Sequence, residues 1–136
     1  MTAFGSPGLP PTGSVGTSTW AQQVGTDLLV NGWTTATLGN SWTAFGGSFA
    51  TPGYQLRAGV VYLQGCMHSG TTSTTVFTLP VGSRPLAAKV FNTNSNSAGF
   101  AEVEILASGV LEVLAYGGTG SNASVFLDGI SFIAEQ

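Results

Sequence analysis

Short apolar runs separated by turn-forming residues dominate the chain after Trp33. Pairs rich in Gly, Asn, Ser and Pro mark the turns, because these residues adopt the backbone conformations that tight turns require. Between the turns lie β-branched and aromatic runs at 59–66, 74–79, 87–92, 101–106, 109–115 and 123–133. Short strands at this spacing predict an all-β sandwich or barrel.

The clearest strand pair is a hairpin around Ser108 and Gly109. Residues 101–105 alternate apolar and acidic side chains, which is typical of a strand with one buried and one solvated face. Residues 110–114 follow the turn and are the expected partner strand. Glu102 and Glu104 then lie on the solvated face, with Glu112 across the hairpin.

Two short frames repeat an Asn-small-Trp-Thr pattern, around Trp33 and around Trp42. One hairpin-sized interval is too short to indicate a repeat architecture. We expect two consecutive turns that each place a tryptophan under the sandwich.

The N-terminal part has a different character. Residues 1–16 hold three prolines and four glycines, which exclude a regular helix or a central strand. Residues 17–29 are the one helical candidate, because Trp20, Val24 and Leu28 share a helix face after a possible Ser or Thr N-cap. We therefore divide the chain into residues 1–30, an extended arm with one short helix, and residues 31–136, the β-sandwich.

Apolar side chains punctuate this arm although a purely solvated spacer has no need of them. Phe4 and Leu9, together with Trp20 of the expected helix, are the residues that we predict to anchor the arm on a neighbouring protein. The alternative is a frayed terminus.

Charged residues make up only 7% of the chain, and the net charge is −3. This composition lacks the basic footprint that nucleic acids or anionic membranes attract. Hydrophobic residues reach 43%, so the low charge does not indicate disorder. A weakly charged, apolar chain is better dispersed when it covers its surface with copies of itself, and we predict a homo-oligomer.

The N-terminus has no basic and apolar signal pattern, and no apolar run approaches the roughly 18 residues of a spanning helix. We expect a protein made in the cytoplasm and not inserted in a membrane.

The catalytic inventory is thin, and we predict no enzyme, no metal and no cofactor. Cys66 and His68 share a strand face, but no third group orients them, and a Cys at a strand end is more often packing. Glu102 and Glu104 also share a face, yet the alternation explains them as solvated side chains rather than a glycosidase pair. Zinc, phosphate-loop and nucleophile-elbow spacings are absent from the sequence.

Two polar segments suggest binding. One, at 92–97, contains Asn92, Asn94 and Asn96, and the other, at 116–122, contains Tyr116 and Asn122. Amides, hydroxyls and a tyrosine ring are the groups that recognise sugars through hydrogen bonds and stacking. These five residues are our predicted ligand-binding set, with a host glycan as the ligand. The alternative is that both segments are ordinary polar turns.

Residues 33–133 resemble the C-terminal domains of tail-fibre and minor tail proteins from phages of actinobacteria. In that family an Asn-Gly-Trp-Thr turn with a Gly-Gly pair precedes a strand, and a Phe-Thr-Leu-Pro segment follows. The matching residues here are Asn40, Trp42, Thr43, Gly46, Gly47, Tyr54, Arg57, Gly59, Val61, Leu63, Gly65, Phe77, Thr78, Leu79, Pro80, Gly82, Arg84 and Pro85, with 127–132 as the closing strand. The chain has Ser41 where the family pattern has glycine, and Ser83 where it has tyrosine. The family's Tyr-Arg-Lys triplet is also spread out, with two residues between Tyr54 and Arg57.

The resemblance implies a jelly-roll-like β-sandwich that forms a homotrimer on a virion and adsorbs to the host surface. Such a short head, with only an arm before it, is expected to cap a tail tip or to decorate a capsid. In both cases residues 1–30 would be the anchor and the sandwich the displayed unit. A glycan-degrading enzyme is a third possibility, which no acid pair supports.

Overall fold

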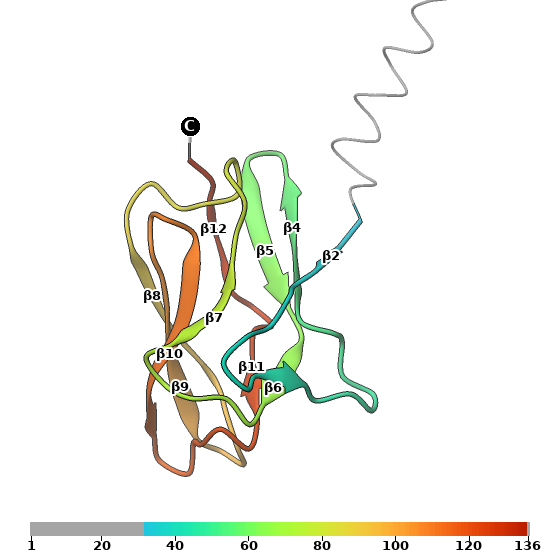
Figure 1. The fold of residues 1–136 in the computed structure, drawn as a ribbon, viewed down its shortest axis with the longest axis vertical. Helices are drawn as coiled ribbons and strands as arrows, with labels where there is room; N and C mark the ends of the chain where they lie inside the picture. The colour runs from blue at the N-terminus through green and yellow to red at the C-terminus, as the bar shows by residue number, and fades with distance from the viewer. Residues whose placement is uncertain (1–31, 136) are drawn as a thin grey trace, which may run out of the picture. The chain divides into compact units, whose positions relative to one another are not determined.

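A computed structural model describes residues 32–135, which form eleven strands in three antiparallel sheets (Figure 1). In this part of the chain no helix is long and apolar enough to cross a membrane. The strands are β2 (Thr34–Thr35), β3 (Thr43–Ala44), β4 (Gly53–Arg57), β5 (Val60–Gln64), β6 (Cys66–His68), β7 (Thr75–Thr78), β8 (Lys89–Asn94), β9 (Phe100–Ile105), β10 (Val110–Gly117), β11 (Val125–Phe126) and β12 (Ser131–Ile133).

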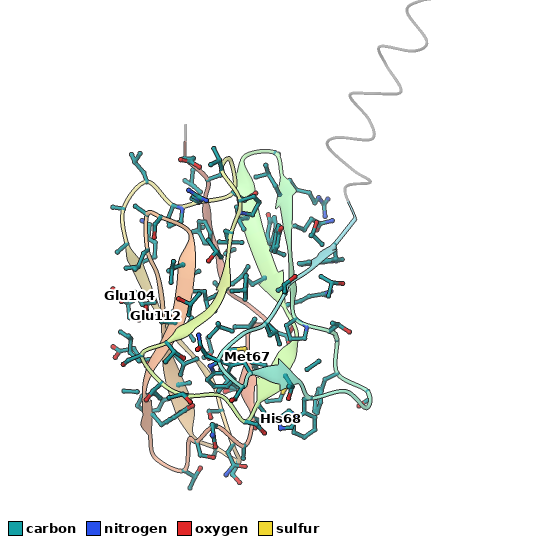
Figure 2. The ribbon with its side chains drawn as sticks, in the orientation of Figure 1. Met67, His68, Glu104 and Glu112 are labelled. Atoms are coloured by element: carbon teal, nitrogen blue, oxygen red, sulfur yellow. The ribbon has the colours of Figure 1, made fainter. Side chains whose placement is uncertain are left out.

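One layer of the sandwich is the sheet β7-β10-β9-β8. The predicted hairpin is confirmed, since β9 pairs with β10 and Glu104 lies directly opposite Glu112. Both carboxylates lie on the outer side of this sheet (Figure 2), while Val103 and Val113 are buried beneath it. A bulge between Val113 and Ala115 shifts the register of β10 against β9. Beyond the bulge, the side chains of β10 no longer follow the simple alternation between buried and exposed positions.

The other layer combines the sheets β12-β5-β4-β2 and β11-β6-β3. β5 and β6 are consecutive along the chain and separated only by Gly65. The φ of Gly65 is 112°, a backbone conformation that glycine adopts readily and other residues rarely do. A Cβ at this position would lie 2.4 Å from the Cα of Pro52. Glycine at position 65 therefore lets one run of chain serve two sheets.

The core lies between the two layers and is mostly aliphatic, with Trp42, Phe77 and Phe132 as its buried aromatic residues. Two ring pairs lie in and against this core: Tyr54 stacks on Phe77 with ring centres 6.3 Å apart, and Phe91 lies tilted against Phe132 at 6.5 Å. Each pair joins a strand of one layer to a strand of the other. Burial of this surface supplies the main stabilising free energy of the sandwich.

Trp42 is the largest fully buried side chain, with 2% of its surface exposed. Its indole Nε1 donates a hydrogen bond to the carbonyl oxygen of Thr71 at 3.2 Å. The ring lies flat on Gly70, where a Cβ would come within 1.9 Å of it. Trp33 differs, because 43% of its surface is exposed. The prediction that both tryptophans lie under the sandwich is right for Trp42 and wrong for Trp33.

The all-β prediction is confirmed for residues 32–135, while several boundaries are corrected. The expected strand at 123–133 splits into β11 and β12, because the turn at Asp128 and Gly129, with φ 88° at the glycine, breaks it. The polar segment at 92–97 is half strand, since Asn94 still pairs with Phe100. Strands β2, β3 and β4 carry weak apolar patterns and were not expected. The arm, the short helix and the anchoring residues Phe4, Leu9 and Trp20 lie outside the described residues.

We expect Gly70→Ala to lower the free energy of unfolding by about 2–4 kcal/mol, because the added methyl displaces the buried Trp42 ring. Gly32→Ala is the matched control, since no atom lies within 4 Å of its would-be Cβ. Urea denaturation followed by tryptophan fluorescence measures both. Equal stability of the two variants would contradict the packing described for Trp42.

Candidate functional site

The two predicted polar segments lie against each other at one end of the sandwich. A Cβ at Gly99 would lie 1.9 Å from the amide nitrogen of Gly120, so the two backbones are in direct contact. The buried Ser95 hydroxyl accepts a hydrogen bond from the Ser121 amide at 3.0 Å and lies 2.7 Å from the Ser124 carbonyl oxygen. Small residues here bring two turns together and fix them.

Two of the predicted ligand-binding amides take part in that fixing. The Nδ2 of Asn96 donates to the carbonyl oxygen of Thr119 at 3.3 Å, and the Thr119 hydroxyl donates back to the Asn96 carbonyl at 2.9 Å. The Nδ2 of Asn122 donates to the carbonyl of Gly70 at 3.0 Å. Both side chains therefore hold neighbouring segments in place.

Tyr116 is half-buried and packs against the core. Its hydroxyl is buried and has no hydrogen-bond partner among the described protein atoms, and burial raises the pKa of the phenol. Tyr116 and Asn122 line one hollow of about 420 Å³ together with Gly70, Thr71, Thr72 and Ser121. Because the Tyr116 ring is partly buried against the core, it is less suited to stacking on a ligand than an exposed ring would be.

The remaining predicted residues lie elsewhere. Asn92 and Asn94 alternate with buried Thr93 on β8, so their exposed side chains are on the outer side of the sheet. The structure thus brings Tyr116 and Asn122 to one hollow, sets Asn96 in the adjoining turn and leaves Asn92 and Asn94 on a sheet face. Ligand binding by the five residues stays a prediction.

Cys66 and His68 are both packed against neighbouring residues. Cys66 is fully buried, and burial raises the pKa of its thiol. The two ring nitrogens of His68 lie 3.2 Å from the Thr43 hydroxyl and 2.7 Å from the Ser69 hydroxyl, and Phe45 packs edge-on against the ring. His68 lies at the far end of the layer from the loop that follows β4 (Figures 1 and 2). Between residues 32 and 135 no group of three His, Cys, Asp or Glu residues could hold a metal ion.

A more open surface lies on the outer face of the sheet β12-β5-β4-β2. Gln55 of β4 pairs with Tyr62 of β5, which pairs in turn with Ser131 of β12. Trp33 precedes β2 and continues this row, since its neighbour Thr34 pairs with Tyr54. We call this surface, made of Trp33, Gln55, Arg57, Tyr62, Gln64 and Asp128, the aromatic platform.

The aromatic platform surrounds a shallow cavity of about 400 Å³, which is also lined by Leu63, Gly129, Ile130 and Ser131. Trp33 and Tyr62 expose 43% and 40% of their surfaces beside it. Asp128 is held in place because its Oδ1 accepts a hydrogen bond from the Gly65 amide at 2.9 Å. Flat apolar rings thus stand beside a carboxylate, a guanidinium and two amides.

The sequence did not reveal this surface, because its residues come from different strands and are brought together only by strand pairing. The signal available was the alternation in residues 60–64, where Tyr62 and Gln64 fall on the face opposite Val61 and Leu63. Gln55 and Arg57 alternate in the same way on β4. Only the register joins these two sets with Asp128, which lies 63 residues after Gly65.

We expect Tyr116→Phe to leave the free energy of unfolding unchanged or slightly higher at neutral pH, because the hydroxyl that it removes is buried without a protein partner. The raised pKa of the phenol favours its neutral form in the folded state. The wild-type protein should therefore lose stability as pH rises above the ordinary tyrosine pKa of about 10 and through the higher folded-state pKa.

Denaturation curves of the wild type and Tyr116→Phe from pH 8 to 11 test this expectation. The variant should lose less stability over that interval than the wild type. A Tyr116→Phe protein that is more than about 1 kcal/mol less stable at pH 7 would mean that the hydroxyl is hydrogen-bonded.

Comparison with known proteins gives a match at the level of the fold. No protein-family model and no curated protein matches the sequence. Among solved structures, the receptor binding protein gp15 of Listeria phage PSA is similar, with a TM-score of 0.68 and 20% sequence identity. The match covers 89% of this chain and 74% of that protein. The chain therefore shares the fold of a phage receptor binding protein.

Proposed function

We propose that this chain is a structural protein of a phage virion, the head of a tail-tip or tail-fibre-like protein that binds the host surface. The observation that carries the proposal is the fold shared with the gp15 receptor binding protein over 89% of the chain. Resemblance of residues 33–133 to tail-fibre domains points the same way. Host-cell glycans are the receptor class that we favour.

The proposed head acts by binding, without catalysis. The environments of the two side chains with catalytic potential are those of residues that serve packing. Cys66 is buried, and His68 lies between two hydroxyls and the Phe45 ring. Glu104 and Glu112 lie side by side on a strand pair, as solvated residues of a sheet face do. In this proposal residues 1–30 join the head to other virion proteins.

We also propose that three copies form a jelly-roll-like trimer. Val81 and Leu86 support this, because they expose 79% and 78% of their surfaces on the segment between β7 and β8. That segment is firmly held: the Gly82 amide donates to the Glu135 carboxylate at 2.7 Å, and the Glu135 amide donates to the Arg84 carbonyl at 2.6 Å. A fixed segment that displays aliphatic side chains is suited to contact with another protein surface.

The location of the protein on the particle tests the virion role. Electron microscopy of particles labelled with an antibody to this chain should give density at the tail end. The purified protein should also compete with phage adsorption, because it would occupy the same receptors. Density confined to the capsid lattice, without competition, would replace the tail role with capsid decoration.

Native mass spectrometry tests the trimer. The wild type should give three times the monomer mass of 13.8 kDa. The double variant Val81→Asp/Leu86→Asp should shift toward monomer, because like charges at a contact between copies repel each other. Val90→Asp is the control, because Val90 is exposed on strand β8, outside the segment that carries Val81 and Leu86. A wild-type monomer would contradict the trimer.

A further inference from the structure

We propose that the aromatic platform is a carbohydrate-binding site that stacks neutral sugar rings on Trp33 and Tyr62. The inference rests on the proposed host-binding function and gives it a place and a neutral, disaccharide-sized ligand. It moves recognition away from the polar turns at the end of the sandwich and onto the outer face of β12-β5-β4-β2.

The first argument is the spacing of the two rings. Tyr62 is on β5, and Trp33 extends β2, with β4 between them. Two strand spacings amount to roughly 9–10 Å, which is on the scale of a disaccharide. The apolar faces of two sugar rings, made of C–H groups, can therefore lie on the two aromatic faces. The sheet carries Tyr62 on β5 and fixes the start of β2, next to Trp33, before a ligand arrives.

The second argument is the kind of polar group around the rings. Gln64 offers an amide, whose oxygen accepts and whose nitrogen donates hydrogen bonds, and sugar hydroxyls can do both as well. Asp128 has one oxygen on the Gly65 amide, so the carboxylate is oriented before a ligand binds. Specificity in concave sites comes from a few polar groups that are fixed in this way.

The third argument concerns charge and selects a neutral ligand. The platform has one cation, Arg57, and one anion, Asp128, beside the same cavity. Their charges cancel, and the chain as a whole carries −3. A polyanionic polymer would find neither a net positive field nor a cluster of cations here.

A second copy of the chain is the competing occupant of this face. The centres of homodimer interfaces are apolar and depleted of charged residues. The platform instead interleaves its two rings with a guanidinium, a carboxylate and amides around a hollow of about 400 Å³. The more exposed aliphatic residues, Val81 and Leu86, lie on a different segment, between β7 and β8.

The test measures binding of fluorescently labelled protein comprising residues 1–136 to cells of the bacterium on which the phage grows. Cells are used untreated, after periodate oxidation, which cleaves vicinal diols of sugars, and after protease digestion. We expect binding to survive protease and to be lost after periodate. Trp33→Ala and Tyr62→Ala should each weaken binding at least about tenfold, since each removes one stacking surface.

Matched variants separate the site from general damage. Phe45→Ala removes a ring that is 44% exposed on another part of the layer, and it should bind as the wild type does. Tyr62→Phe keeps the stacking ring and should retain most of the affinity. Asp128→Asn keeps an oxygen for the Gly65 amide, so it should fold normally and lose affinity only through the changed contact with the ligand.

Each contrary result has a distinct meaning. Binding that survives periodate but not protease overturns the carbohydrate assignment and leaves the proposed function intact. Wild-type affinity in both Trp33→Ala and Tyr62→Ala overturns the site. A change of oligomeric mass in these variants shows that a second copy covers the face, which also overturns the site. If the wild type does not bind the cells at all, the proposed function itself fails.

Discussion

The contact between Gly65 and Asp128 is the constraint on which the rest of the second layer depends. The chain passes from β5 to β6 through Gly65, in a conformation that residues with a Cβ rarely adopt. At the same point the Asp128 carboxylate accepts the Gly65 amide at 2.9 Å, and the Gly65 carbonyl accepts the Leu127 amide at 2.8 Å. The central strand and the closing strand therefore bend together. This shared bend lets β5 pair with β12 and β6 pair with β11.

The same contact gives the outer face its chemistry. A carboxylate with one oxygen bound to a backbone amide is held on its turn, and its remaining acceptor capacity can face a ligand. The turn that carries Asp128 lies beside Tyr62, because Ser131 of β12 pairs with that residue. A structural hydrogen bond thus places a polar group at the edge of the aromatic platform. Such double use of one residue means that its substitutions must be compared by folding as well as by binding.

The sequence allowed the strand content and the β9–β10 hairpin to be predicted, because both depend on local alternation and nearby turns. It did not allow the fate of each tryptophan to be predicted. Trp33 and Trp42 sit in nearly identical local frames, yet one is exposed and the other is buried. The difference arises from a distant residue: Gly70 leaves room for the Trp42 ring. Information of this kind is carried by tertiary contacts and not by spacing along the chain.

The same reasoning explains why the polar turns were chosen as the ligand site and the platform was missed. Asn and Ser clusters are visible in the sequence as potential hydrogen-bonding groups, but the sequence does not say where those groups are used. In the structure Asn96, Asn122 and Ser95 bind the backbone of neighbouring segments.

A polar turn in a small sandwich must first satisfy its own buried backbone groups, which consumes the side chains that look most available. A sheet face has no such need, because the ladder already pairs its amides and carbonyls. Its side chains are therefore not needed to satisfy the backbone, and the strands hold them at fixed spacing. On this ground, exposed rings such as Trp33 and Tyr62, held beside polar side chains on paired strands, are a stronger indication of a binding surface than an equally polar loop.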